Sequence, residues 1–183
     1  SQPIADLFYK IGLEIQELEK FQPDITKHPG LMKGHLPFMG EILLGHLRYG
    51  TQGKNNVEFC HPFIKRNLVP GKNIALAGNF NLVNTEELFN NLKSTTSTSK
   101  ESDLGAMIET IHEALCEADA SNPDQLNLET ILKQATINFD GGFVCSGLVG
   151  NGDSFVLRDA HGIRPAYYFC NDEIVVAASE RPA

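Results

Sequence analysis

The chain has 183 residues, enough for one domain with a sizeable core, and its 42% hydrophobic and 21% charged content is ordinary for a globular protein. Its formal net charge is −8 and it contains no basic run, which argues against nucleic acid or an anionic membrane surface as a partner. No apolar run approaches the roughly 18 residues of a membrane helix, and no signal peptide is visible, so we expect a cytoplasmic protein.

In the first half of the chain, apolar residues at three- and four-residue spacing predict an amphipathic helix over 3–21, with Pro23 just beyond it. Glycines and prolines then predict a loop over 24–40. Three strands are expected beyond the loop, the last two forming a hairpin around a turn at 69–72; they cover 42–49, 59–65 and 74–77.

In the second half, Asn84 followed by Glu87 has the capping-box pattern and predicts a helix that runs to about Lys93. Two more helices are expected over 101–118 and 125–137, the first with an inward stripe of Leu104, Ile108, Ile111 and Leu115. Tight-turn residues separate four strands at 142–149, 154–158, 166–170 and 173–179. Such a meander pairs antiparallel, so the whole pattern predicts an α+β fold.

The four cysteines form no C-x-x-C pair, and we expect them to be buried free thiols in a reducing cytoplasm; they are Cys60, Cys116, Cys145 and Cys170. The six histidines lack the H-x-x-x-H and H-E-x-x-H spacings, so no metal site is predicted.

The most informative stretch is G-H-L-R-Y-G-T-Q-G at 45–53, which follows a short apolar run. Gly50 and Gly53 suit a turn that brings the backbone close to a ligand. Arg48 stands between them and the apolar run, where a planar guanidinium can hold a carboxylate through two parallel hydrogen bonds. An arginine paired with a local acidic residue would give the same pattern, so this stretch alone leaves both interpretations open.

Two further stretches complete a pattern. The sequence N-I-A-L-A-G-N-F-N-L-V-N at 73–84 reads as a strand, an Asn-rich turn and a helix start, and R-D-A-H-G-I-R-P at 158–165 precedes V-A-A-S-E at 176–180. In this order, the three resemble the glutaminase domain of class II glutamine amidotransferases. Tyr49 and the G-I-R-P box point to the members that use phosphoribosylpyrophosphate. The resemblance runs from about Glu41 to the C-terminus, and the first forty residues show no motif.

This resemblance implies the four-layer αββα sandwich of N-terminal-nucleophile hydrolases, with two antiparallel sheets between outer helices. Family members carry a nucleophilic cysteine at the mature N-terminus, whereas this chain begins Ser1-Gln2-Pro3. We therefore expect 1–183 to be one partial glutaminase domain, inactive alone, with 1–40 of uncertain equivalence and 41–183 matching the family. The nucleophile segment and a phosphoribosyltransferase domain would lie outside it.

The resemblance also implies a function for the whole protein: release of ammonia from glutamine for transfer to phosphoribosylpyrophosphate, in the first committed step of purine synthesis. Glutamine is then the small-molecule substrate, and the whole protein is expected to be a homo-oligomer. No cofactor is expected for this piece, while Mg²⁺ with phosphoribosylpyrophosphate is expected for the transferase domain.

Site residues can be carried over from the family motifs. Arg48 matches the residue that holds the glutamine α-carboxylate, and Thr51 lies in the same contact region. Asn79 matches the side-chain donor of the oxyanion hole. Phe80 stands where the family has the glycine whose backbone N–H is the second donor, and Gly78 stands where the family has histidine.

The family's acidic partner for the substrate ammonium group falls near 98–103, where Glu101 is the first candidate and Asp103 the second. Acidic residues also stabilise helix N-termini, so a purely structural role is an equal alternative. His161 and Arg164 lie in a box that the resemblance does not place at the glutamine, and we interpret them as structural.

The changes at Gly78 and Phe80 leave two alternatives open. One is a related N-terminal-nucleophile amide hydrolase without transferase activity. The other is a non-catalytic module of the same fold.

Overall fold

The structure is a computed structural model that describes residues 2–47, 60–93, 102–118 and 126–181. The chain divides into two compact units, Ser1–Leu43 and Leu44–Ala183, and each is considered by itself. No helix among the described residues is both long and apolar enough to cross a membrane.

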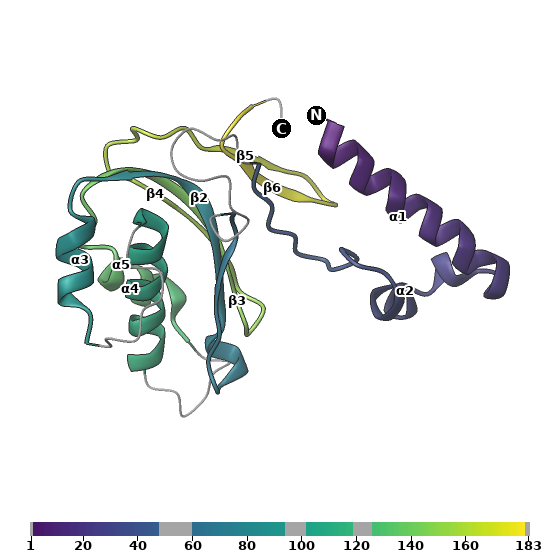
Figure 1. The fold of residues 1–183 in the computed structure, drawn as a ribbon, viewed down its shortest axis with the longest axis horizontal. Coiled ribbons are helices and arrows are strands. Elements are labelled where there is room, and N and C mark those ends of the chain that lie inside the picture. Colours follow the sequence, from purple (N-terminus) through teal and green to yellow (C-terminus); the bar gives the residue numbers. More distant parts are fainter. Residues whose placement is uncertain (1, 48–59, 94–101, 119–125, 182–183) are drawn as a thin grey trace. The chain divides into compact units, whose positions relative to one another are not determined.

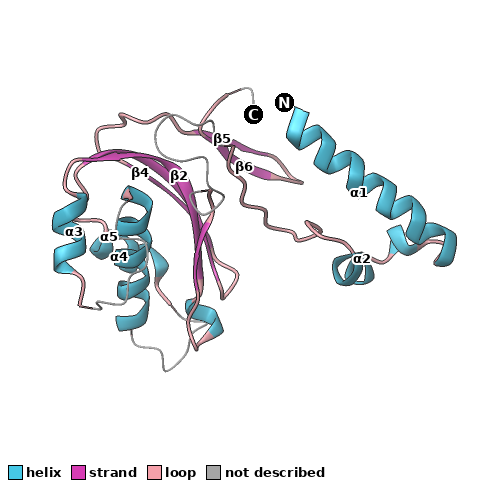
Figure 2. Ribbon diagram, in the orientation of Figure 1, coloured by secondary structure: helices cyan, strands magenta, loops and turns pink. Residues whose placement is uncertain are grey.

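The first unit is helical. Helix α1 spans Gln2–Phe21, which confirms the predicted amphipathic helix, and a short 3₁₀ turn over Ile25–Lys27 leads to helix α2 at Pro29–His35 (Figures 1 and 2). The loop expected over 24–40 is therefore wrong in part. Proline at the first helical position needs no backbone N–H partner there, so Pro29 starts α2 rather than breaking it.

The second unit is built on a four-stranded antiparallel sheet in the order β1-β2-β3-β4. Its strands span Phe63–Lys65, Ile74–Leu82, Gly141–Val149 and Ser154–Arg158. Figure 1 shows helices α3, α4 and α5 together on one face of this sheet; they span Thr85–Asn91, Asp103–Glu117 and Leu128–Ala135. Strands β5 (Tyr167–Cys170) and β6 (Val175–Ala178) pair with each other as a separate antiparallel hairpin.

The core lies between the sheet and α4. Alternate residues of β2 and β3 face the helices and are buried, among them Ile74, Leu76, Leu82, Phe143, Cys145 and Val149. The predicted stripe on α4 is confirmed, since Leu104, Ile108, Ile111 and Leu115 are all buried in the same cluster. The period-2 pattern of the strands thus meets the 3.6-residue pattern of the helix in one apolar layer.

A buried lysine closes the C-terminal end of α4. Lys72 is the last residue of the 3₁₀ turn at Pro70–Lys72 and is only 6% exposed. Its Nζ donates to the carbonyl oxygens of Cys116 at 2.8 Å and Ala118 at 3.2 Å. The last carbonyls of a helix have no intrahelical partner, so the lysine satisfies them and complements the negative end of the helix dipole.

Several predicted elements need correction. The strand expected over 42–49 is wrong for its described part, because 42–47 form no strand; 48 and 49 lie outside the described residues. The strand expected over 59–65 begins only at Phe63. The prediction of an Asn-rich turn after Ala77 is also wrong, since β2 continues to Leu82 and pairs with β3 over its whole length. Strand assignment depends on a partner strand, which no local pattern reveals.

The capping prediction at Asn84 is half right. Asn84 does occupy the position before α3, yet its side chain makes no capping bond. Its Nδ2 donates to the carbonyl oxygen of Asn138 at 2.7 Å, and its Oδ1 accepts from the N–H of Asp140 at 3.2 Å. Asn84 therefore ties α3 to the start of β3 instead of closing its own helix.

The thiols are free, but the expectation that they are buried is wrong for three of them. Cys145 alone is buried, and burial raises the pKa of its thiol to about 12. Cys60, Cys116 and Cys170 are exposed.

Candidate active site

The site is organised by the direction of the peptide groups in β2. Hydrogen bonds from Gly150 N to Asn73 O (2.8 Å) and from Val83 N to Asp140 O (3.0 Å) fall at the two ends of the β2–β3 pairing. Peptide groups alternate sides along an antiparallel strand. The backbone N–H and C=O groups of the odd-numbered residues of β2 therefore point toward β3. Those of Phe80, an even-numbered residue, point toward the opposite edge of the strand.

That opposite edge is open at Phe80. Strand β1 pairs with β2 only as far as Leu76, so none of the described strands covers the next residues. The N–H of Phe80 consequently has no ladder partner within the described part of the chain. It is available as a donor, as the second oxyanion contact requires.

The side chain of Asn79 lies beside this edge. Asn79 pairs with Val144, and period-2 alternation places both side chains on the sheet face away from the helices. Asn79 is exposed, and its amide makes no hydrogen bond with another described residue. A side-chain donor and a backbone donor that bond to no other described residue thus follow each other directly.

Gly78 and Phe80, the two departures from the family pattern, prove to be a single structural change. A Cβ on Gly78 would lie 2.6 Å from Cε1 of Phe80, so the phenyl ring occupies the space that a side chain at 78 needs. The same Cβ would lie 2.2 Å from the carbonyl oxygen of Val144 in β3. Glycine at 78 therefore permits both the close approach of β3 and the ring of Phe80, which turns toward the helix-side core.

Asp103, at the start of α4, reaches the same open edge. Its Oδ2 accepts from Leu82 N at 2.9 Å and its Oδ1 accepts from Thr85 Oγ1 at 2.5 Å. The N–H of Leu82 points the same way as that of Phe80, two residues and about 7 Å away along the strand. The structure thus places the Asp103 carboxylate on the same edge of β2 as the Phe80 N–H, whereas the Asn79 side chain lies on the sheet face away from the helices. Each carboxylate oxygen of Asp103 keeps a lone pair beyond its internal bond.

The other predicted site residues, Arg48, Thr51 and Glu101, lie outside the described residues. His46, two residues before Arg48 in the sequence, is described and makes a ring contact. Its ring centroid lies 4.2 Å from that of His61, and the His61 centroid lies 5.6 Å from that of Phe80. The described start of the G-H-x-R motif, at His46, therefore lies next to the open edge of β2.

The chain is similar to several known proteins. The amidophosphoribosyltransferase of Methanothermobacter thermautotrophicus is 28% identical over 145 residues, which cover 79% of this chain and 28% of that protein. The amidophosphoribosyltransferase of Mycobacterium leprae is 30% identical over 142 residues, 77% of this chain and 25% of that protein. The structure of glutamine phosphoribosylpyrophosphate amidotransferase from B. subtilis, complexed with ADP and GMP, matches with a TM-score of 0.55 and 25% identity, over 73% of this chain and 26% of that one.

The chain is similar to class II glutamine amidotransferases of the amidophosphoribosyltransferase type. No protein-family model matches it. It spans about a quarter of the length of the curated relatives it matches. The match to the solved amidotransferase confirms the predicted fold class, of which this chain supplies antiparallel sheets and a helical layer.

The R-D-x-x-G-I-R-P box forms a self-contained loop. Arg158 donates from Nε to the carbonyl oxygen of Arg164 at 2.5 Å and from Nη2 to that of Gly162 at 2.7 Å. Asp159 is 5% exposed, and its carboxylate accepts from the N–H groups of Phe143 (3.2 Å), Ile163 (2.8 Å) and Arg164 (3.0 Å). The box is thus held by its own arginine and aspartate.

Two effects on the Asp159 pKa oppose each other. Burial alone would raise the pKa, but hydrogen bonds from the backbone of Arg164, Ile163, Phe143 and His161 hold it below its usual value. Asp159 has no role in the sequence-based predictions, although an aspartate followed by a glycine three residues later is an ordinary loop signal.

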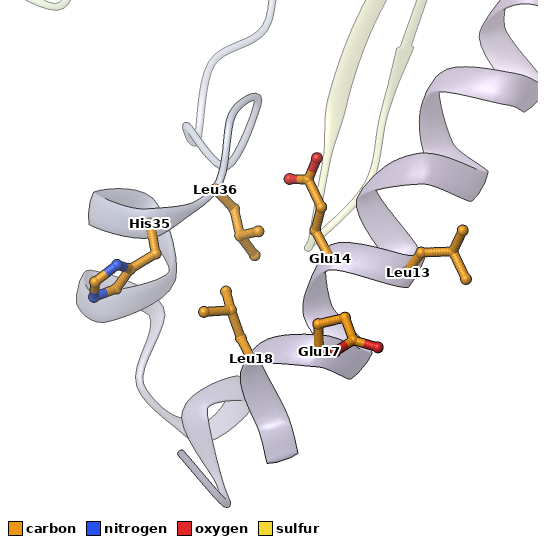
Figure 3. Close-up of a pocket in the computed structure, with 6 residues that line it drawn as sticks. All are labelled: Leu13, Glu14, Glu17, Leu18, His35 and Leu36. Carbon is orange, nitrogen blue, oxygen red and sulfur yellow. The ribbon is translucent and has the colours of Figure 1, made fainter. Parts of the chain in front are cut away.

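A shallow pocket elsewhere is not the amidotransferase site. It lies in the first unit and is lined by residues of α1 and the end of α2 (Figure 3): Leu13, Glu14, Glu17, Leu18, His35 and Leu36. Leu18 and Leu36 point toward each other across it, whereas the ring of His35 turns away. None of the predicted glutamine-site residues lines it. Among the described residues, no group of three or more His, Cys, Asp or Glu side chains is placed to hold a metal ion.

Proposed function

We propose that this chain forms the glutamine-hydrolysing part of an amidophosphoribosyltransferase, which releases ammonia from glutamine for transfer to phosphoribosylpyrophosphate in the first committed step of purine synthesis. The observation that supports it is the open edge of β2, where the Asn79 amide and the Phe80 N–H stand next to each other without partners among the described residues. The similarity to amidophosphoribosyltransferases supports the same reaction class.

Amide hydrolysis in this site would start with attack of a thiolate on the side-chain carbonyl carbon of glutamine, and we propose that the thiol is supplied by an N-terminal cysteine outside 1–183. Negative charge then develops on the carbonyl oxygen. Asn79 Nδ2 and the Phe80 N–H are the donors that would stabilise it, and both are in place before charge develops. Collapse of the tetrahedral intermediate releases ammonia, and water then frees glutamate from the enzyme.

The amino-acid end of glutamine would be held by opposite charges. Arg48, with Thr51 beside it, would bind the α-carboxylate through two parallel hydrogen bonds. Glu101 or Asp103 would bind the ammonium group. Asp103 has the better support of the two, because its carboxylate lies at the edge that carries the oxyanion donors.

The remaining features belong to the proposal for the whole protein. Glutamine is the substrate of this part, Mg²⁺ with phosphoribosylpyrophosphate would serve a transferase domain, and the assembly would be a homo-oligomer. A related amide hydrolase without transferase activity is the second candidate, and the phenyl ring at position 80 in place of glycine is the observation that favours it.

The decisive experiment measures the product of the complete reading frame. With glutamine, we expect glutamate release, and with phosphoribosylpyrophosphate and Mg²⁺ we expect phosphoribosylamine from either glutamine or free ammonia. Glutamate release without transfer would indicate the simple hydrolase. The absence of both activities would indicate a non-catalytic module. The 183-residue chain by itself should release no glutamate.

Arg48→Lys separates a binding role from a structural one. Lysine keeps the charge but loses the two-pronged geometry. We expect a KM for glutamine raised by about 10-fold or more while ammonia-dependent transfer persists. An equal fall of both activities would instead assign Arg48 to the fold.

A further inference from the structure

Three aromatic rings form a continuous stack beside the open edge of β2. The centroids of His46 and His61 are 4.2 Å apart at an interplanar angle of 39°, and those of His61 and Phe80 are 5.6 Å apart at 41°. Phe63 of β1 meets the other side of His61 edge-on, at 5.7 Å and 79°. Each distance falls within the 4.5–7 Å range of aromatic pairs or just below it.

The two ends of this stack belong to different parts of the proposed glutamine site. His46 lies two residues before Arg48, the proposed ligand of the substrate carboxylate. Phe80 carries the proposed backbone donor of the oxyanion hole. His61 lies between them and comes from neither motif.

The peptide of Phe80 needs such a support. Strand β2 has β3 on one side at this point, but β1 ends its pairing at Leu76. Among the described strands, the ladder therefore fixes Phe80 from one side only. The ring of Phe80, held over Gly78 and against His61, supplies a second restraint on the residue whose N–H must point at the substrate.

We propose that His61 is a positioning residue that couples the G-H-x-R segment to the oxyanion strand through its stacked ring. The inference rests on the proposed function for its kinetic consequences but on ring contacts for its structural ones. It also accounts for phenylalanine at a position where the family has glycine: a glycine at 80 has no ring to meet His61.

The kinetic test compares His61→Ala with His61→Phe in the product of the complete reading frame. Loss of the ring releases both ends of the stack, so His61→Ala should raise the KM for glutamine and lower kcat together, by about 10- to 100-fold in kcat/KM. His61→Phe keeps an aromatic ring and should recover activity to within a few-fold of the wild type. His112→Ala, which changes another half-buried histidine outside the stack, should leave both constants unchanged.

A double-mutant cycle with Phe80→Leu tests whether the two rings act as one unit. If they do, Phe80→Leu should weaken binding of the product L-glutamate in the wild-type background and have little further effect beside His61→Ala. Additive effects of the two changes would overturn the coupling. So would a His61→Phe variant that is correctly folded by circular dichroism yet as impaired as His61→Ala.

A spectroscopic measurement keeps the coupling separate from the function. In the 183-residue chain labelled with ¹³C in its histidine rings, Phe80→Leu should shift the ring signals of His46 as well as those of His61. An unchanged His46 signal would refute the coupling even in an active enzyme. Absence of both glutamine turnover and glutamate binding in the wild-type protein would count against the proposed function, and the ring signals would still decide the coupling.

Discussion

Replacing Asn79 by alanine tests the oxyanion assignment most directly. The Asn79 side chain is exposed and makes no hydrogen bond with another described residue, so its loss should leave the fold intact. An oxyanion donor acts only when charge develops on the substrate oxygen, and its loss therefore lowers kcat more than it changes binding. Removing one such donor costs about 10²–10³ in kcat, or roughly 2.7–4 kcal/mol of transition-state stabilisation.

The chain offers a matched control two residues away. Asn81 is also exposed and lies on the same strand and the same sheet face, on the other side of Phe80. We expect Asn79→Ala to lose 10²–10³ in glutaminase kcat with a KM changed only a few-fold, and Asn81→Ala to stay within a few-fold of wild type. Steady-state glutamate release by the product of the complete reading frame gives both constants, and ammonia-dependent transfer reports on the rest of the enzyme.

The reasoning fails if Asn79→Ala keeps the wild-type kcat while glutamine is still hydrolysed. It also fails if both alanine variants fall equally, because a shared loss would reflect a general disturbance of β2. A thermal melt excludes simple unfolding, since neither change removes a described hydrogen bond or a buried group.

Three further predictions concern the scaffold. Lys72→Met should cost about 2–3 kcal/mol and lower the Tm by roughly 5–10 °C, because the last carbonyls of α4 lose their buried donor; Lys133→Met, at an exposed ion pair, should not change the Tm measurably. Gly78→Ala should destabilise by at least about 1–3 kcal/mol in urea unfolding, since its Cβ meets the backbone of β3; wild-type stability would show that the strands can separate freely. The lowered pKa of Asp159 stabilises the fold above the ordinary carboxyl pKa, and this contribution disappears as pH falls through the folded value. The Tm gap between wild type and Asp159→Asn should therefore be present at pH 7 and close on acidification below about pH 4; a constant gap would contradict the assignment.

The sequence predicted those parts of the fold whose signal is local. The stripe on α4 recurs with helical period, and the turn residues around β3 and β4 mark the ends of strands, so both were assigned nearly to the residue. The apolar run before the G-H-x-R motif carried the same signal as those strands, yet its described part is no strand. A short apolar run shows only that burial is favourable and not which partner provides it.

The local structure around the predicted site residues differs from the expectation. Motif matching singled out Asn79 and Phe80, but placed them in a turn, whereas they lie within β2. The error matters chemically, because in a strand the direction of the Phe80 N–H follows from ladder alternation and need not be guessed. Asp103 came second to Glu101 by spacing, and only its bond to Leu82 N places it at the edge. His61 could not be found from the sequence, because its role depends on contacts with segments distant along the chain.

Phe80 illustrates how a departure from a family motif is judged physically. Taken alone, a phenylalanine for a glycine beside a reacting carbonyl suggests a blocked or degenerate site. In the structure the side chain leaves the site entirely: it turns to the helix side of the sheet, into space that Gly78 vacates, while the N–H keeps the direction that the ladder imposes. The substitution therefore changes what supports the proposed donor and leaves its N–H in place, which is why variants at 61, 78 and 80 test the proposed site better than the presence or absence of the family glycine.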